Sequence, residues 1–549
     1  MRVTRREALK ILSIGGGVLY LQACSAQKRV SGAVGESFDA DIGPVDRTMK
    51  DLAPPRFFGD DPTRAHKILW NPKRPPAPEP TERRSVVVIG GGMSGLATTY
   101  HLRAHDPVLL EQADRVGGNA KGQAWNGSDY PIGAAYFMDT DEGSELEAFY
   151  KEVGVNDLRK EKGAGDPFLL DGKVQREFWS GALDPKGRAQ FAKLKKYFED
   201  VYNEENGRIY PAIPYEDGEM RAYVRKLDRE TFLEHVEKVA GGKLNPLIRS
   251  AMEHYCWSSF NASMSEVGAA FGLNFYAAEF GKVWVTPAGN AGVAEAILKK
   301  IRGSLPRGNL RARSTVTEVR VVEDGVRVTY ADERERYRTI HAKAAVMACP
   351  KYVCKHVLAG IEPERKAAMD AIAYRGYVVG SVLLKKPLRE DFYDLYLLNR
   401  GEDFSDAKVA ADRQRYTDVV NGFYANASAE RSVLTLYRGF PHGEGRAELY
   451  AEGAYARFKN EFRAQIETDI LPILGFSPGD VVDLRLARYG HAMPVAARGK
   501  LTDGTIDTIR KPFKDRVFFV EQDNWVLPAI ETSLEESFVA AKAVEKILA

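Results

Sequence analysis

A glycine-rich segment near residue 90 has the residue types needed for close approach to a phosphate group. Gly90-Gly91-Gly92-Met93-Ser94-Gly95 directly follows an apolar run. Gly90 permits a tight turn, Gly92 lets backbone N–H groups approach a pyrophosphate, and Gly95 lets the next helix pack closely. Glu111 comes about twenty residues after the first glycine, where a carboxylate binds ribose hydroxyls. These residues predict a site for an adenine dinucleotide.

The neighbouring residues predict the elements that must position this turn. Residues 85–89 are rich in valine, as expected for a strand buried on both faces. Residues 96–103 have helical spacing, and residues 107–110 supply a second strand that ends at Glu111. A glycine-rich turn alone is weak evidence, because such turns are common in loops. Strand, turn, helix, strand and acid in this order predict an α/β fold with a Rossmann-like domain.

The residues after the second strand indicate which dinucleotide binds. Residues 111–119, Glu-Gln-Ala-Asp-Arg-Val-Gly-Gly-Asn, resemble the Glu-x-x-x-Arg-x-Gly-Gly-Arg signature of the superfamily of flavin-containing amine oxidases, protoporphyrinogen oxidases and phytoene desaturases. The resemblance implies FAD. It places Glu111 at the adenosine ribose, Arg115, Gly117 and Gly118 at the pyrophosphate and ribityl chain, and Gln112 among the cofactor contacts. Asn119 stands where the family has a second arginine, so one phosphate contact would be lost or water-mediated.

Three later segments extend this resemblance. Residues 129–137, which include Gly133, Ala134, Ala135 and Tyr136, are similar to the small-residue segment beside the isoalloxazine ring; a tight strand crossing is the alternative. Val316 matches a position whose backbone contacts adenine. Residues 516–541 resemble the C-terminal flavin segment, with Asp523 as a candidate ribityl contact and a helix beginning near Ile530 that would present its N-terminus to the flavin.

Two residues depart from the family pattern in that C-terminal segment. Glu521 and Thr532 occupy positions where the family usually has glycine. We therefore expect them to crowd or re-route the ribityl chain, although Glu521 is kept among the candidate cofactor contacts.

Candidate catalytic residues are sparse, because flavin chemistry depends mainly on placement and exclusion of water. Tyr489 and His491 are the candidates, although a lone histidine is more often structural. Val379 occupies the position where monoamine oxidases carry a flavin-facing lysine that assists reaction with oxygen, so the resemblance implies a dehydrogenase. No cysteine lies near residues 489–498, where monoamine oxidases attach the flavin, so FAD is expected to be non-covalent.

The length of 549 residues predicts more than one lobe. We expect an FAD-binding domain with a parallel sheet and a β-meander, built from residues 85–140, 281–360 and 496–549. An α+β substrate domain would comprise residues 141–280 and 361–495. Residues 25–84 are proline-rich and predict a tether or packed-down arm. Aromatic residues between positions 255 and 280 line the substrate pocket or fill the core.

The N-terminus predicts export. Arg5 and Arg6 precede a short apolar run, which resembles a twin-arginine signal over residues 1–24, and the residues before Cys24 resemble a lipobox. The expected location is periplasmic, or anchored by an acylated Cys24 to the outer side of the cytoplasmic membrane. The alternative is an ordinary amphipathic helix.

The composition limits the classes of binding partner that we expect. Lys and Arg total 78 against 76 Asp and Glu, and this balance disfavours nucleic acid. The four cysteines form no CxxC pair, so no metal site is expected. We expect a small-molecule substrate, with electrons passed to a carrier protein, a quinone or, slowly, oxygen.

Three functions remain open from the sequence. The first is an FAD-dependent dehydrogenase that removes hydride from a C–N bond of an amine. The second is a desaturase, isomerase or protoporphyrinogen-type oxidase acting on an apolar substrate. The third is a flavin-stabilised lipoprotein that binds a ligand without turnover.

Overall fold

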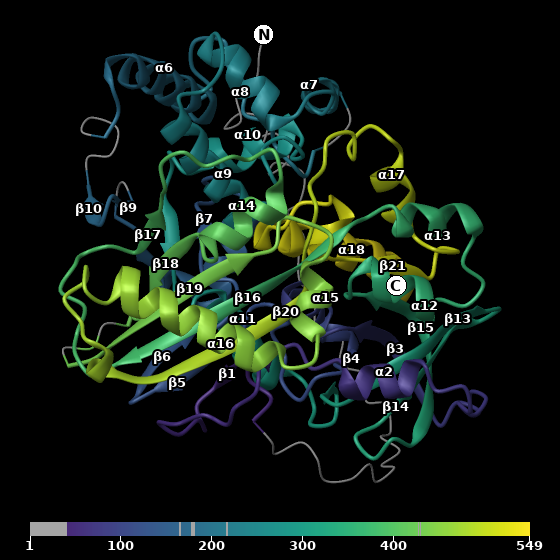
Figure 1. The fold of residues 1–549 in the computed structure, drawn as a ribbon. Coiled ribbons are helices and arrows are strands. Elements are labelled where there is room, and N and C mark those ends of the chain that lie inside the picture. The colour runs from purple at the N-terminus through teal and green to yellow at the C-terminus, as the bar shows by residue number, and fades with distance from the viewer. Residues whose placement is uncertain (1–40, 164–165, 177–181, 216–217, 427, 429) are drawn as a thin grey trace.

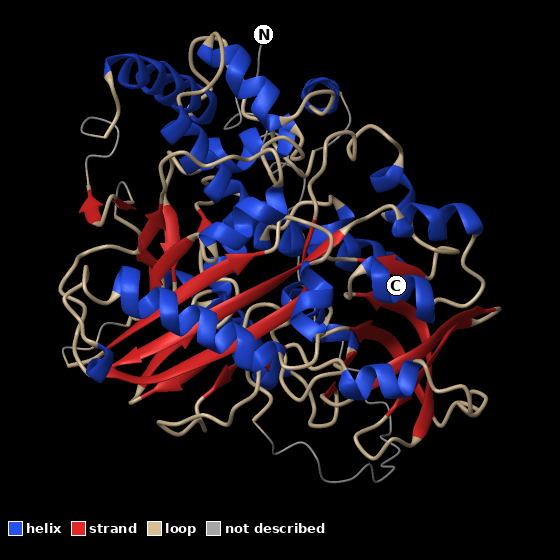
Figure 2. Ribbon diagram, viewed as in Figure 1, coloured by secondary structure: helices blue, strands red, loops and turns tan. Residues whose placement is uncertain are grey.

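The computed structural model describes residues 41–163, 166–176, 182–215, 218–426, 428 and 430–549. The predicted export signal, Cys24 and the first part of the arm lie outside the described residues. Two large sheets with helices packed on them dominate the described chain (Figure 1, Figure 2). Within these residues, no helix combines the length and apolar character needed to cross a bilayer.

The first sheet contains the predicted dinucleotide-binding strands. Its order is β12-β4-β3-β15-β14-β13, with β21 also paired to β15. β3 is parallel to β4 and β15, whereas β13, β14 and β15 form an antiparallel meander. The bounds are β3 Glu82–Ile89, β4 Val108–Leu110, β12 Leu310–Arg311, β13 Thr315–Val322, β14 Gly325–Ala331, β15 Tyr337–Met347 and β21 Val517–Phe519.

Alternating residues of β3 determine how helices cover this sheet. Val86 and Val88 pack with α3 (Met93–His101), α11 (Asn290–Ser304) and α18 (Ile530–Leu548), while Val87 and Ile89 belong to the core on the opposite face. Both faces are therefore buried, as the valine-rich run predicts. The expected α/β class, with a Rossmann-like domain and a β-meander, is confirmed.

The second sheet has the order β10-β9-β17-β18-β19-β16-β20-β2 and is mostly antiparallel. α16 (Ala454–Gln465) packs on one face through Phe458 and Phe462, and the opposite face contributes residues such as Val379 and Tyr437 to a separate cluster (Figure 1). The bounds are β9 Phe168–Leu170, β10 Lys173–Gln175, β16 Tyr374–Leu384, β17 Asp394–Leu397, β18 Asp418–Asn421, β19 Ser432–Gly439 and β20 Val481–Pro494.

Helices from residues 185–278 form the lobe at the top of Figure 1. Local signals fix their starts: Asp184 caps α6 ahead of Pro185, and Thr231 and Glu234 form a capping box on α8. The bounds are α6 Pro185–Tyr202, α7 Glu219–Leu227, α8 Phe232–Ala240, α9 Pro246–Phe260 and α10 Ala269–Ala278, whereas α4 (Glu145–Val153) packs with α11 and α18 on the first sheet.

Shorter elements complete the fold. The helices are α12 Lys351–Val357, α13 Pro363–Asp370, α14 Ala407–Gln414, α15 Gly445–Tyr450 and α17 Thr505–Ile509, with helical turns η1 Arg103–His105, η2 Val155–Asp157, η3 Ile466–Ile470, η4 Pro478–Asp480 and η5 Gln522–Asn524. The strands are β5 Gly122–Trp125, β6 Ser128–Pro131, β7 Phe137–Met138, β8 Lys160–Glu161 and β11 Val283–Val285.

The described part of the N-terminal arm is packed onto both sheet regions. β1 (Val45–Asp46) pairs with β5, β2 (Phe58–Gly59) pairs with β20, and α2 spans Thr63–Leu69. Strand β3 also starts at Glu82, three residues before the predicted boundary at residue 85. The arm carries regular structure that its composition does not indicate, because each short strand is stabilised by a long-range partner.

Candidate active site

A single cavity of about 2780 Å³ connects the two sheets. Its wall includes the glycine turn after β3, the end of β4, the start of α18 and the inner face of the second sheet. Pockets for single drug-sized ligands are roughly 300–1,000 Å³. The cavity is therefore large enough for a dinucleotide together with a second molecule.

The glycines after β3 shape one end of this cavity. Gly90 has φ +110°, and a Cβ there would lie 2.2 Å from the Ala348 carbonyl oxygen. A Cβ at Gly95 would lie 1.9 Å from the Gly90 carbonyl oxygen, so Gly95 serves helix packing and does not line the cavity. A Cβ at Gly92 would meet only the Gly118 Cα, at 3.8 Å. Gly92, Met93 and Ser94 line the cavity where α3 begins, as an anion-binding helix N-terminus requires.

Glu111 follows β4 directly and lines the same end. Its carboxylate accepts hydrogen bonds from the Gly91 N–H at 2.6 Å and the Ala113 N–H at 2.7 Å. A carboxylate offers about four acceptor positions, so Glu111 can still accept from ribose hydroxyls. Gln112 and Val316 lie in the same wall.

Arg115 has a different environment from the predicted one. Its guanidinium donates to the Asp46 carboxylate at 3.1 Å, the Asp41 carboxylate at 3.2 Å and the Gly43 carbonyl at 3.1 Å. Arg115 also lines the cavity, so its contact with the pyrophosphate stays a prediction, although carboxylates of the arm already share its charge. Backbone N–H groups of the glycine turn and of α3 remain for the phosphates.

The middle of the cavity is formed by two close backbone crossings. Gly117 and Gly118 have φ of +113° and +59°, and a Cβ at Gly133 would lie 2.1 Å from the Asn119 carbonyl oxygen. All three line the cavity with Ala134, Ala135 and Tyr136. Residues 133–135 therefore form both a tight backbone crossing and part of the cavity wall. The two alternative interpretations of this segment are compatible with each other. Asn119 donates from Nδ2 to the Ala492 carbonyl at 2.8 Å.

The C-terminal flavin segment requires a correction of the prediction for Asp523. Its carboxylate accepts from the Lys351 backbone N–H at 2.7 Å and from the Tyr374 hydroxyl at 2.6 Å, and it forms an ion pair with the Lys351 ammonium. Both members of the ion pair are fully buried, and Asp523 does not line the cavity. Asp523 therefore stabilises the fold of this segment and is not placed to contact a ribityl chain.

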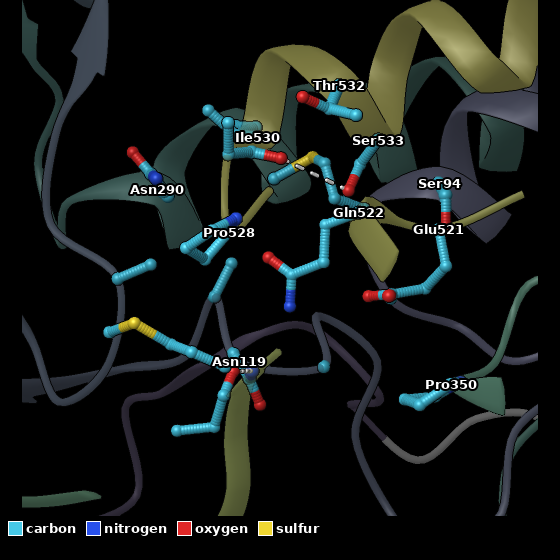
Figure 3. Close-up of a pocket in the computed structure, with 18 of the residues that line it drawn as sticks. Ser94, Asn119, Asn290, Pro350, Glu521, Gln522, Pro528, Ile530, Thr532 and Ser533 are labelled. Atoms are coloured by element: carbon cyan, nitrogen blue, oxygen red, sulfur yellow. Dashed lines mark hydrogen bonds between the residues drawn. The ribbon is translucent and has the colours of Figure 1, made fainter. Parts of the chain in front are cut away.

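Glu521, in contrast, points toward the cavity beside Ser94 and Gln522 (Figure 3). Burial, with the neighbouring Asp523 carboxylate as a second cause, raises the pKa of Glu521 to about 8. The carboxyl is therefore mostly protonated at neutral pH and can donate a hydrogen bond. Its backbone is extended, with φ 172°, so replacing glycine here requires no strain.

Two buried oxygens in the cavity wall have no hydrogen-bond partner among the described residues: Thr532 Oγ1 and Asn290 Oδ1. They flank Ile530 at the start of α18 (Figure 3). A buried polar atom without a partner is costly, so these atoms indicate a polar ligand. Together with the helix N-terminus they suit the polar edge of a flavin, whose carbonyls accept and whose ring N–H donates. The residues present therefore fit the group that the sequence predicts.

The predicted catalytic residues line the cavity but have structural contacts. The Tyr489 hydroxyl donates to the Ile132 carbonyl at 2.7 Å, directly before Gly133. His491 stacks on Tyr352 with ring centroids 3.8 Å apart and contacts the Arg446 guanidinium. Burial, then Arg446, lowers the pKa of His491 to about 3. Such an imidazole is a weak base, and the contacts of both residues hold the cavity wall in position; their catalytic roles stay predictions.

The far end of the cavity is the inner face of the second sheet. Val379, Tyr437 and Asp418 lie opposite one another on β16, β19 and β18, and all three line the cavity. Tyr377 and Asp394 line it as well. Sequence reasoning identified only Val379 here. Of the aromatic residues singled out between positions 255 and 280, only Phe275 lines the cavity; the others lie in the surrounding core.

One signal for the missed carboxylates was present in the sequence. Asp394 and Asp418 each begin a short strand and are followed directly by apolar residues. A carboxylate at such a position is unusual in a buried strand. Its location next to the other carboxylate depends on strand pairing, which composition does not reveal.

Known proteins resemble this chain in sequence. The family described as flavin containing amine oxidoreductase matches residues 93–431. Oxidoreductase PigB of Serratia sp. (strain ATCC 39006) is 22% identical over 514 residues, which cover 84% of this chain and 75% of PigB. A stretch of 102 residues, 18% of this chain and 17% of the relative, is 35% identical to 15-cis-phytoene desaturase of Narcissus pseudonarcissus.

Solved structures share the fold. Wild-type putrescine oxidase bound to putrescine has a TM-score of 0.62 and 15% identity, covering 85% of this chain and 100% of that one. Cyclohexylamine oxidase from Brevibacterium oxydans IH-35A has a TM-score of 0.59 and 16% identity, covering 85% of this chain and 98% of that one. The family match extends from the dinucleotide cradle into the second sheet, and the chain therefore belongs to the flavin-containing amine oxidoreductases and is a flavin-dependent oxidoreductase.

Proposed function

We propose that the protein binds FAD non-covalently and oxidises an amine at a C–N bond as a dehydrogenase. The observation that carries this proposal is the continuity of one cavity from Gly92 and Glu111 to the inner face of the second sheet at Val379. FAD supplies the hydride acceptor when bound. The protein's own residues bind the cofactor, orient the substrate and exclude water.

The adenine end supports a dinucleotide cofactor. Glu111 is available to ribose hydroxyls, Gly92, Met93 and Ser94 line the cavity where α3 begins, and Val316 lies in the same wall. Ile530, Thr532 and Asn290 would hold the polar edge of the flavin ring. Among the described residues, the three cysteines lie at positions 256, 349 and 354, and none of them belongs to β20, the strand that contains residue 489. This supports non-covalent binding.

The substrate end supports an amine. Tyr377 and Tyr437 line the cavity with ring centroids 6.0 Å apart, and tyrosine faces attract cationic nitrogen groups. Carboxylates share this wall, whereas a polyene would need an apolar one. Two proteins of the same fold are named for putrescine and cyclohexylamine, which favours the same class of substrate.

The electron acceptor in this proposal is a quinone or a carrier protein. Val379 is 2% exposed and lies at the cavity wall. Its side chain carries no ammonium group that could assist the reaction with oxygen. Export through the twin-arginine-like signal, with a lipid on Cys24, would place the enzyme beside membrane quinones. Fractionation of cells producing the full chain, compared with Cys24→Ser, tests this: the wild type would enter the membrane fraction and the variant would not.

The decisive experiment uses the purified protein and its absorption spectrum. We expect a flavin spectrum, release of FAD by denaturation, and anaerobic bleaching by primary amines but not by polyenes or porphyrinogens. Reoxidation by a quinone should be faster than by air. Bleaching by a polyene would establish the desaturase alternative. A flavin that no substrate bleaches, although dithionite reduces it, would establish the binding-protein alternative.

A further inference from the structure

Two buried carboxylates occupy the cavity wall away from the dinucleotide end. Asp394 and Asp418 are 2% and 3% exposed, and both line the cavity. Asp394 on β17 lies opposite Val420 on β18, and Asp418 precedes Val420 by two residues. Side chains in this relation share one face of the sheet as diagonal neighbours, with Cα atoms about 7–8 Å apart. The two carboxyl groups therefore face the same part of the cavity.

Asp394 lacks a partner for one of its oxygens. Its Oδ1 has no hydrogen-bond partner among the described residues, whereas Asp418 accepts from the Thr417 hydroxyl and from the Ser258 hydroxyl at 3.2 Å. A buried acceptor without a donor carries its full desolvation cost. For the ionised carboxylate the missing partner is a hydrogen-bond donor, and the cavity is the side from which it can enter.

The protein's own cations do not fill this role. Lys162 Nζ lies 2.6 Å from the Asp166 carboxylate and 3.4 Å from that of Glu279, which occupy it. His254 hydrogen-bonds the Leu397 carbonyl and Glu402. Within the described residues, the carboxyls of Asp166, Glu279 and Asp394 thus share the Lys162 ammonium group, and Asp418 has His254 as its neighbouring base, so the cluster has room for another positive charge.

The pKa shifts of the two carboxyl groups agree with this geometry. Burial raises the pKa of Asp394 well above its usual range, and burial raises the pKa of Asp418 to about 7. Both groups hold protons more tightly than exposed carboxyls do. A bound cation would favour their ionised forms and offset part of the burial cost.

The acidic pair lies at a defined distance from the flavin-facing wall. In register, Asp418 lies opposite Tyr437, and Tyr437 lies opposite Val379. Two strand spacings, about 10 Å, therefore separate Asp418 from Val379. Tyr437 lies between them, and its hydroxyl donates to the Gly133 carbonyl at 2.7 Å.

This separation distinguishes two nitrogens of the substrate. Hydride loss from a carbon next to nitrogen requires the nitrogen lone pair, so the reacting amine must be unprotonated. A nitrogen held as a cation by carboxylates is consequently a different one, several bonds away. We propose that Asp394 and Asp418 bind a protonated nitrogen remote from the C–N bond that is oxidised, so the substrate is a diamine or polyamine. This inference rests on the proposed function.

The test compares cadaverine with pentylamine, which has the same chain but one nitrogen. Binding is measured by titration calorimetry with holoenzyme whose flavin has been reduced with dithionite, and turnover by anaerobic bleaching of the oxidised holoenzyme. We expect cadaverine to bind at least about tenfold more tightly than pentylamine. Asp394→Asn should remove most of that advantage and leave pentylamine binding unchanged.

Three further variants keep the result interpretable. Asp418→Asn should repeat the loss if Asp394→Asn fails to fold, and Asp394→Glu should restore part of the preference. Asp61→Asn removes an exposed carboxylate at the cavity rim on the arm and should change neither ligand.

The outcomes separate this inference from the proposed function. Equal binding of cadaverine and pentylamine, or a preference that survives both asparagine variants, overturns the inference even if amines bleach the flavin. Carboxylate-dependent cadaverine binding without bleaching by any amine supports the cation site and overturns C–N oxidation.

Discussion

The two ends of the cavity are built by different means. At the dinucleotide end, backbone groups dominate: glycines permit turns and close crossings, and Glu111 is held by two backbone N–H groups. At the substrate end, side chains from β16, β17, β18 and β19 converge on one sheet face. The dinucleotide end therefore depends on local backbone conformation, whereas the substrate end depends on strand register.

Gly92→Val should show the largest effect of this difference. The added side chain would project into open cavity and occupy the space for the pyrophosphate, without a clash with the protein. We expect near-complete loss of bound FAD with the fold retained, measured by absorbance at the flavin bands and by circular dichroism.

Gly303→Val on α11 is the matched control, because a Cβ there meets nothing within 4 Å. It should keep its flavin. A Gly92→Val protein that retains stoichiometric FAD would show that the cradle lies elsewhere.

Asp523→Asn tests the corrected role of Asp523 beside the dinucleotide end. The change leaves the Lys351 ammonium buried without its counter-ion. Removing one partner of a buried pair costs about 3–5 kcal/mol, so the free energy of unfolding in urea should fall by that amount. Replacing both residues, as Lys351→Met with Asp523→Leu, should recover much of the loss. If Asp523→Asn instead keeps wild-type stability and loses FAD, Asp523 is a cofactor contact.

Glu521 gives the dinucleotide end a pH dependence of its own, in addition to that of Asp394 and Asp418 at the substrate end. Its pKa is raised from 4.5 to about 8 in the folded protein, so between these values the folded state binds more protons than the unfolded state. The free energy of unfolding contributed by this group therefore falls as pH rises across that window. We expect the apoprotein to lose about 2 kcal/mol, less than the full linkage value because the carboxyl faces the cavity.

Glu521→Gln should flatten that part of the urea-denaturation profile between pH 5 and 8, relative to the wild type. An unchanged slope in the variant would place the titrating group elsewhere.

Val379→Lys probes the substrate end directly. An ammonium group at this wall position should assist the reaction of reduced flavin with oxygen, as the family resemblance implies. We expect reoxidation by air to accelerate about tenfold, a barrier change of ~1.4 kcal/mol, in stopped-flow absorbance measurements. Val379→Met, of similar length and without charge, should not accelerate it. Equal rates for the lysine and methionine variants would contradict the explanation of slow oxygen reaction.

Tyr489→Phe should have the smallest effect. It removes a hydrogen bond to the Ile132 carbonyl, for which a loss of about 1 kcal/mol in unfolding free energy is expected. Turnover at saturating amine should stay within about fivefold of wild type, since 1 kcal/mol corresponds to that factor. A much larger loss of turnover with unchanged stability would place Tyr489 among the catalytic residues.

The departures between sequence and structure have a common physical reason. Arg115 and Asp523 carry charges that attract partners from any part of the chain, and here Asp46 and Lys351 are those partners. The arm contributes β1 and β2 only because β5 and β20 offer open edges. Such contacts join residues tens to hundreds of positions apart, and spacing along the chain contains no record of them.

The dinucleotide cradle and the Rossmann-like sheet could be predicted from the sequence alone. A turn, a strand and a helix N-terminus arise from consecutive residues, and steric limits on non-glycine backbone make Gly90 and Gly118 informative where they stand. Asp394, Asp418, Tyr437 and Val379 share one wall of the cavity because distant strands pair in the tertiary structure. A shift of one residue in the pairing of β17, β18 or β19 would turn these side chains to the opposite face, and folding of the whole sheet onto its core fixes that register.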